Sequence, residues 1–179
     1  MTLIEKADAF AARAHEGQKR KGSDEPYITH PRAVAAMLKA RGFGDTVIAA
    51  ALVHDVVEDT PATIGEVRLK LGEEVARLVE PLTHDNSLPW EEKKQKYIDA
   101  VRMASDEAKA IAVADKIHNA QSLIAGHRVQ GAAVWKHFNR SREKKLWFEE
   151  AMLKMLQETW DNPMVDEYAS LVAQLRELD

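Results

Sequence analysis

The sequence contains no cysteine, few aromatic residues (6%) and no long uncharged apolar segment. Without cysteine the chain has no disulfide bond, no thiolate ligand for an iron–sulfur cluster and no thiol nucleophile. No apolar segment approaches the roughly 18 residues that a membrane-spanning helix needs. The charged start MTLIEKADAF does not resemble a signal peptide. We therefore expect a cytoplasmic protein that does not bind a membrane.

An excess of positive charge is also absent. The chain has 25 Lys and Arg against 29 Asp and Glu, for a net charge of −4. This balance gives no indication of nucleic-acid binding or of attraction to an anionic membrane. Its 179 residues are enough for one domain with a substantial core, and no linker-like composition or internal repeat divides them. We predict a single domain over residues 1–179.

Start and stop signals for helices recur along the whole chain. Thr2 with Glu5 and Thr63 with Glu66 have the spacing of a capping box. Glycines follow several segments of helical apolar periodicity, and no segment alternates as a strand would. The sequence predicts an all-α bundle of about 8–10 helices. We expect them over residues 2–16, 31–41, 45–59, 63–71, 73–83, 89–104, 106–125, 141–160 and 164–178.

The segment LVHDVVEDTP, residues 52–61, places four ionisable groups in an apolar stretch. On a helix over 45–59, His54, Asp55, Glu58 and Asp59 share one side, and the earlier part is apolar all round, as in a buried helix. Crowded, buried carboxylates are costly, and a divalent cation offsets that cost. Imidazole and carboxylate together suit a first-row transition metal. The alternative is a solvated acidic helix end, which the helix dipole disfavours.

Further ligands must come from other helices. His30 immediately precedes Pro31 at the start of a predicted helix, and Asp115 lies in a mostly apolar helical segment. Lys116 and His118 are alternative, structural partners for Asp115. Asn119 follows Asp115 by one helical turn and should face the same way. The remaining histidines show no metal-ligand spacing, and we expect surface or structural roles for His15, His84, His127 and His137.

A polar segment, GQKRKGSDEPYITHP at 17–31, separates the first two predicted helices. Segments of this length in compact domains are usually functional or disordered. Its basic residues, with Lys93 and Lys94 from another helix, are suited to binding phosphates and stacking on a purine. The alternative is ordinary solvated charge, and the adjoining EPYITHP favours substrate binding.

These motifs together resemble a known family. HDVVEDT, with RKGSDEPYITHP before it and ADKIHNAQSL after it, is similar to the HD-domain metal-dependent phosphohydrolases. Within them the chain resembles the (p)ppGpp hydrolase domain of RelA/SpoT proteins, especially the small alarmone hydrolases. LTHDNSLPWEEKK and HFNRSREKKLWF extend the likeness over nearly the whole chain. The resemblance implies a single HD-domain helical bundle that removes the 3′-pyrophosphate of ppGpp, giving GDP, or of pppGpp, giving GTP. It implies no synthetase or regulatory domain.

The resemblance also implies roles for individual residues. Glu58 and Asp59 match the family's catalytic acidic pair, and the metal in the family is typically Mn²⁺. The implied metal ligands are His30, His54, Asp55 and Asp115.

The implied substrate-binding residues lie on three segments. Arg20 and Lys21 match the basic pair of the substrate loop, where the arginine packs on the guanine. Asn119 matches a residue near the ribose and phosphate, and Lys94 a phosphate-binding lysine. RKGSDEP is one residue longer than the bacterial pattern, close to RKSGEP, so the positions of Ser23 and Asp24 do not follow from the resemblance.

Two other hypotheses remain. An HD phosphohydrolase for another nucleotide, such as NADPH or a nucleoside monophosphate, would share the metal ligands and differ at Arg20, Lys21 and Asn119. A non-catalytic nucleotide sensor would not need Glu58 and Asp59. The presence of all five residues favours the alarmone hydrolase. The sequence leaves the oligomeric state open, including a homodimer through apolar faces of the last helices.

Overall fold

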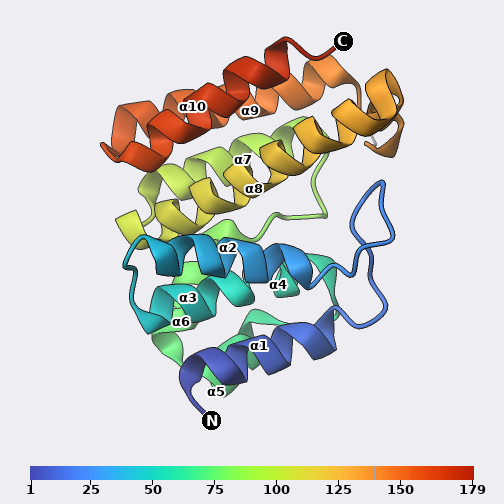
Figure 1. The fold of residues 1–179 in the computed structure, drawn as a ribbon. Coiled ribbons are helices and arrows are strands. Elements are labelled where there is room, and N and C mark those ends of the chain that lie inside the picture. The colour runs from blue at the N-terminus through green and yellow to red at the C-terminus, as the bar shows by residue number, and fades with distance from the viewer. Residues whose placement is uncertain (139) are drawn as a thin grey trace.

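The computed structural model describes residues 1–138 and 140–179, and within them the protein is all-α, as predicted. The described residues form ten α-helices and two 3-10 segments (Figure 1). None of the described helices combines the length and hydropathy that crossing a bilayer requires. The elements are α1 (Leu3–Ala14), α2 (Thr29–Ala40), α3 (Asp45–Leu52), α4 (Val56–Asp59), α5 (Ile64–Leu71), α6 (Glu73–Val79), η1 (Glu80–Leu82), α7 (Trp90–Met103), α8 (Asp106–Gln130), η2 (Gly131–His137), α9 (Arg142–Thr159) and α10 (Pro163–Arg176).

The helices stack in layers around α8. In Figure 1, α9 and α10 lie at one end with the C-terminus, α7 and α8 follow, then α2, α3 and α6, and α1 and α5 lie at the other end with the N-terminus. α8 packs against α2, α3, α7 and α10. All its residues from Ala108 to Ile117 are buried. A helix buried on every side forms the centre of a bundle, and α8 therefore carries Asp115 and Lys116 into the interior.

Local signals explain several helix ends, but not the end of α8. Both predicted capping boxes are present: Glu5 N donates to Thr2 Oγ1 and Glu66 N donates to Thr63 Oγ1, each over 3.2 Å. The predicted stop at Gly126 is wrong, because α8 continues to Gln130. A Cβ at position 126 would lie 3.1 Å from Val134 Cγ2. Gly126 thus gives η2 room to pack against α8 and does not terminate the helix.

The prediction of one continuous helix over 45–59 is also wrong. α3 ends at Leu52, and α4 begins only at Val56. His54 Nδ1 donates to the Ala51 carbonyl over 2.7 Å, the acceptor that the backbone N–H of residue 55 would use in an unbroken helix. The His54 side chain therefore replaces a helical hydrogen bond, and His54 and Asp55 lie in a turn.

The loop predicted over 17–31 is hairpin-like and ends earlier, because α2 already begins at Thr29. Lys19 and Pro26 form an isolated antiparallel bridge, Arg20 N donates to the Glu25 carbonyl and Tyr27 N donates to the Gln18 carbonyl, each over 2.9 Å. Residues 21–26 are exposed. The additional residue of RKGSDEP therefore falls in an exposed tip, and both arms of the loop keep their hydrogen-bonded positions.

Candidate active site

The four predicted metal ligands come from three elements and meet in the interior. His30 lies in the first turn of α2, His54 and Asp55 in the turn between α3 and α4, and Asp115 in the middle of α8. One ligand atom from each lies within 4.8 Å of the others. His30 Nε2 is 3.0 Å from Asp115 Oδ1, and His54 Nε2 is 3.1 Å from Asp55 Oδ2. We call these four residues the His–Asp cluster.

The donor set of the His–Asp cluster fits a divalent cation. Because a carbonyl only accepts, His54 Nδ1 carries a ring proton, and in the neutral ring Nε2 carries the lone pair that can bind a metal. His54 Nε2 is buried and has no hydrogen-bond partner, an arrangement that is costly unless another group binds there. Two imidazole nitrogens and two carboxylates are ligands that divalent transition metals favour. The cluster is therefore suited to hold such an ion.

Two side chains behind the His–Asp cluster, the half-buried His118 and the buried Lys116, fix two of its members. His118 Nδ1 is 2.7 Å from His30 Nδ1, which leaves His30 Nε2 directed into the cluster. Lys116 Nζ lies 3.1 Å from Asp115 Oδ2. Burial opposes ionisation of Asp115, but the Lys116 ammonium and the hydrogen bond from His30 hold its pKa well below the usual range. Of the two structural partners considered for Asp115, Lys116 contacts it, whereas His118 contacts His30.

A second buried charge cluster lies on α9 and α10. Glu149 is 1% exposed, and its carboxylate accepts from Lys145 Nζ and from the Tyr168 hydroxyl, each over 2.5 Å. Burial lowers the pKa of Lys116, but Asp115 and, to a smaller extent, the Glu149 carboxylate raise it, and the net shift is upward. We call Lys145, Glu149 and Tyr168 the Glu149 cluster.

The acidic pair on α4 is held at two different places. Glu58 Oε2 accepts from His84 Nδ1 over 2.7 Å. Asp59 Oδ2 lies 3.0 Å from the Tyr27 hydroxyl, which is also 2.7 Å from Asp55 Oδ2. Burial and the charges of Asp55 and Glu58 raise the pKa of Asp59 to about 6. Burial also raises the pKa of Glu58, but His84 and Lys94 together outweigh it and the net shift is downward. The two carboxylates thus differ in acidity, as acid–base pairs in active sites do.

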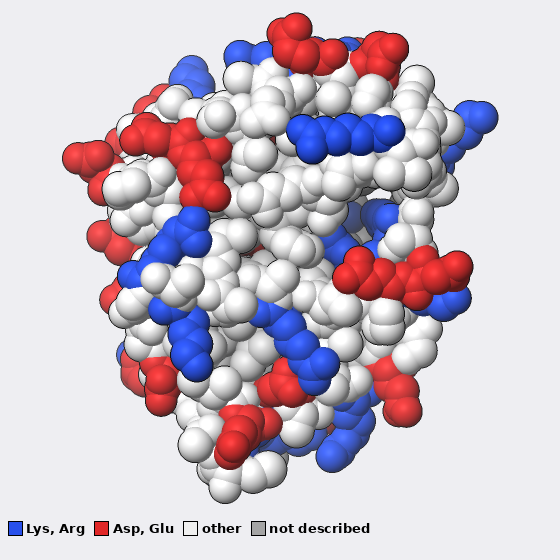
Figure 2. All heavy atoms as spheres, in the orientation of Figure 1, with Lys and Arg blue, Asp and Glu red and all other residues white. Residues whose placement is uncertain are grey.

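Three of the four predicted substrate-binding residues are connected to carboxylates of the site: Arg20 and Asn119 to Asp115, and Lys94, through His84, to Glu58. Arg20 Nη2 donates to Asn119 Oδ1 over 2.9 Å, and Asn119 Nδ2 donates to Asp115 Oδ1 over 2.6 Å. Lys94 Nζ is 3.2 Å from His84 Nε2. Lys21 is exposed at the loop tip and takes no part in these described contacts. Figure 2 shows positive side chains inside a hollow between this loop and the C-terminal helices.

Comparisons with known proteins identify the family. A family model described as an HD domain matches residues 7–142. The chain belongs to the HD-domain family. The predicted resemblance to RelA/SpoT-type hydrolases is confirmed by relatives named guanosine-3′,5′-bis(diphosphate) 3′-pyrophosphohydrolase. The human relative, MESH1, is 43% identical over 143 residues, which cover 74% of this chain and 79% of MESH1. Bifunctional (p)ppGpp synthase/hydrolase SpoT of Escherichia coli is 40% identical over 126 residues, which cover 67% of this chain and 18% of SpoT.

A solved structure shows the same fold over the full length. It is of a metazoan ortholog of SpoT, described as hydrolysing ppGpp. Its TM-score is 0.83 at 28% sequence identity, and the match covers 100% of this chain and 98% of that one. The helical fold of this HD-domain chain is therefore shared with that solved structure.

Within this HD-domain site, sequence reasoning missed two important residues. Tyr27 bridges Asp55 and Asp59, although the sequence shows it only as part of EPYITHP. His84 binds Glu58 and has a side chain only 8% exposed; no spacing rule connects two residues so far apart. His15 is also buried, at 3% exposure, with Nδ1 2.8 Å from Gln18 Oε1 and Nε2 without a hydrogen-bond partner, so it is not a surface group.

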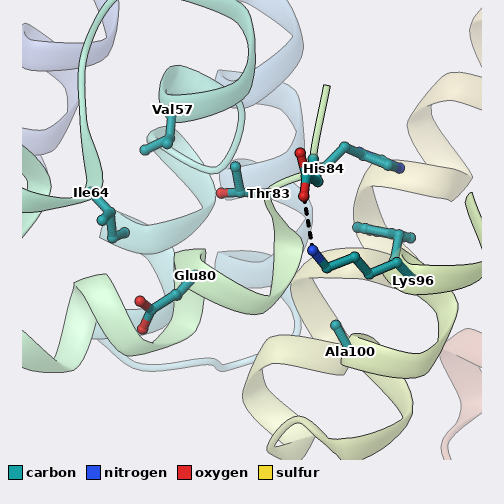
Figure 3. Close-up of a pocket in the computed structure, with 9 residues that line it drawn as sticks. Val57, Ile64, Glu80, Thr83, His84, Lys96 and Ala100 are labelled. Atoms are coloured by element: carbon teal, nitrogen blue, oxygen red, sulfur yellow. Dashed lines mark hydrogen bonds and ion pairs between the residues drawn. The ribbon is translucent and has the colours of Figure 1, made fainter. Parts of the chain in front are cut away.

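A pocket of about 330 Å³ adjoins the HD-domain site at His84 (Figure 3). The His84 ring stacks on Tyr97, with ring centroids 4.1 Å apart and planes inclined by 10°. Lys96 bonds Asp85 over 2.8 Å at this pocket. Most of the exposed lining is apolar, and its residues are Val57, Ile64, Glu80, Thr83, His84, Asp85, Lys96, Tyr97 and Ala100.

Proposed function

We propose that this protein hydrolyses the 3′-pyrophosphate of guanosine 3′,5′-bis(diphosphate), giving GDP and pyrophosphate, and of pppGpp, giving GTP. The supporting observation is that the His–Asp cluster lies directly beside the Glu58–Asp59 pair and the Arg20–Asn119 hydrogen bond. Relatives with 40–43% identity are named for this reaction. The cytoplasm is the proposed location.

The His–Asp cluster would hold the metal, and we propose Mn²⁺ as the ion. When bound, a divalent cation supplies acidity to water and countercharge to phosphate oxygens. His118 and Lys116 keep His30 and Asp115 in their ligand orientations, as outer groups do around metal ligands generally.

The acidic pair would perform the proton chemistry. Glu58 and Asp59 orient the attacking water and accept its proton. Tyr27 holds Asp59 close to Asp55 without a direct clash of charge, because its hydroxyl lies within hydrogen-bond distance of both. His84 holds Glu58 at a separate point.

The substrate would lie along the positive side chains. Arg20, whose guanidinium lies 5.5 Å from the centroid of the Tyr27 ring, would stack on the guanine. Asn119 would contact the ribose and phosphate region. Lys94 and the exposed Lys21 would bind phosphates. We propose one hydrolase domain over residues 1–179. A homodimer stays a prediction, which size-exclusion chromatography with light scattering would test.

The first experiment incubates the purified, Mn²⁺-loaded protein with ppGpp and follows pyrophosphate and GDP. An EDTA-treated sample and a reaction with NADPH run beside it. Metal-dependent release of pyrophosphate and GDP supports the proposal. No release from ppGpp, with phosphate release from NADPH, would transfer the activity to another nucleotide.

Two variants separate metal binding from turnover. Asp55→Ala should lose both Mn²⁺ binding, measured by isothermal titration calorimetry, and activity. Glu58→Ala should keep Mn²⁺ binding and lose turnover. Metal loss in the second variant would reassign Glu58 as a ligand, and activity in the first would remove Asp55 from the metal site.

A further inference from the structure

Three side chains from three elements form a continuous hydrogen-bonded chain beside the His–Asp cluster. Glu58 lies on α4, His84 between η1 and α7, and Lys94 on α7. His84 Nδ1 is 2.7 Å from Glu58 Oε2, and His84 Nε2 is 3.2 Å from Lys94 Nζ. We propose that His84 is a positioning residue that fixes the Glu58 carboxylate and connects it to Lys94. The inference rests on the proposed function and assigns a role to a histidine that the sequence left as a surface or structural group.

The direction of the hydrogen bonds follows from the chemistry of the end groups. An ammonium group only donates, and an ionised carboxylate only accepts. Lys94 Nζ therefore donates to His84 Nε2, and His84 Nδ1 carries the ring proton and donates to Glu58. Only this neutral tautomer makes both bonds. Burial lowers the pKa of His84, which favours the neutral ring.

The His84 ring is held firmly enough to position its partner. It stacks on the buried Tyr97, and its side chain is 8% exposed. The His84 backbone N lies 3.5 Å from the same Glu58 oxygen, Oε2. Because both contacts use Oε2, Oε1 is the oxygen left to face water and substrate. His84 would thus select which Glu58 oxygen reacts.

The chain also links the catalytic carboxylate to a phosphate-binding group. Lys94 is largely enclosed, with Nζ 4.5 Å from the centroid of the Phe148 ring. Burial and the charge of Lys116 lower the pKa of Lys94 to about 7. A polyphosphate near Lys94 would favour the ammonium, which directs its hydrogen bond to His84 and favours the proton on Nδ1. The charged groups acting on Glu58, Asp59 and Lys94 include Asp55, Lys93, Lys116 and Lys145.

Two amide substitutions separate the two ring nitrogens. The amide of His84→Asn reaches the position of Nδ1 and can still donate to Glu58, whereas that of His84→Gln reaches the position of Nε2. In steady-state ppGpp hydrolysis we expect His84→Gln to lower kcat by about 10–100-fold, as for a misplaced catalytic group. KM should stay within about threefold. His84→Asn should keep kcat within about fivefold of the wild type, because a donor remains at the Nδ1 position.

The matched control is Asn86→Ala. Asn86 lies in the same segment and donates to the Glu58 backbone carbonyl over 3.3 Å, so it tests disturbance of the segment without loss of the carboxylate contact. Asn86→Ala should keep kcat within about twofold of the wild-type value. Mn²⁺ affinity, measured by calorimetry, should be unchanged in all three variants.

A pH titration gives a readout that a merely structural role would not move. Without the His84 donor, burial dominates, and the pKa of Glu58 should rise in His84→Gln and not in His84→Asn. The Glu58 carboxyl is titrated directly by ¹³C NMR in Zn²⁺-loaded protein without substrate, which separates it from Asp59. An upward shift in His84→Gln alone supports the proposal.

The outcomes distinguish this inference from the proposed function. If the wild type does not hydrolyse ppGpp, the proposed function fails, and the NMR titration still tests the contact between His84 and Glu58. If the wild type is active and His84→Gln keeps both its kcat and the pKa of its Glu58 carboxyl, the inference is overturned. Equal loss of kcat in the Asn and Gln variants would overturn it too, because the Nδ1 donor would then not be the group that matters.

Discussion

Replacing Glu149 by glutamine should destabilise the protein by about 3 kcal/mol at pH 7, the scale for breaking a buried ion pair. The carboxylate is 1% exposed and accepts from Lys145 and Tyr168. Glutamine has nearly the same shape but no charge, and its amide nitrogen cannot accept from the second donor. A hydrogen bond to a charged group contributes about 1.5–3 kcal/mol. The remaining cost comes from leaving Lys145 without its partner.

Urea denaturation followed by circular dichroism measures this difference. For a chain of this size, a loss of about 3 kcal/mol corresponds to a melting temperature lower by roughly 6–12 °C. The control is Glu150→Gln on the same helix. Glu150 forms an ion pair with Arg176 in which both side chains are about half exposed, and such pairs contribute about 0–1 kcal/mol.

The pH dependence of this stability difference tests whether the charge of Glu149 is its cause. Burial raises the pKa of Glu149, but Lys145 and Lys116 outweigh it, so the folded pKa lies below the ordinary value of 4.5. The stabilisation is therefore complete above pH 4.5 and is lost as the pH falls through the folded pKa. The difference between wild type and Glu149→Gln should shrink in acid. A difference below about 0.5 kcal/mol at pH 7, the range of ordinary surface substitutions, would refute the reasoning.

Three further predictions concern the site. Burial and neighbouring carboxylates raise the pKa of Asp59 from 3.8 to about 6. Ionisation of Asp59 therefore lowers the stability of the metal-free folded protein increasingly between these two pH values, and by a constant amount above them. Asp59→Asn should accordingly melt at a higher temperature than the wild type at pH 8 but not at pH 4, while losing turnover. Arg20→Ala, which breaks the bond to Asn119, should raise KM for ppGpp by about tenfold or more with a smaller change in kcat; the same change at the exposed Lys21 should have a smaller effect. Tyr27→Phe removes a hydroxyl that bonds the His–Asp cluster and should lower Mn²⁺ affinity by about 10–100-fold in calorimetry; unchanged affinity would show that the hydroxyl does not position the ligand.

The sequence allowed prediction of features that are local or carried by a motif. The capping boxes at Thr2 and Thr63 depend on residues three apart, and the structure contains both. The residues expected in the metal site, such as His54 and Asp55, stand out because their charge is unusual in an apolar segment. The structure brings all four of them together, and their role as ligands stays a prediction.

Features decided by long-range packing could not be predicted. The helix break at Val53 leaves the 3.6-residue periodicity intact, because it arises from the side chain of His54. Gly126 has the sequence appearance of a helix stop, yet it is small because η2 packs on it. The contact between Glu58 and His84 depends on how α7 and the segment before it fold back onto α4. No pattern within a short window of sequence predicts such a long-range contact.

The residues of the His–Asp cluster come from distant parts of the chain, and a bound ion would therefore affect folding. His30 and Asp115 are 85 positions apart, and they belong to different layers of the bundle. An ion held between them would act as a removable cross-link that closes a long loop, and it would stabilise only the folded chain. We expect the layers carrying α1 and α2 to exchange their amide hydrogens faster when the cation is withdrawn. The abundance of the folded protein in a cell would then follow its metal supply as well as its rate of synthesis.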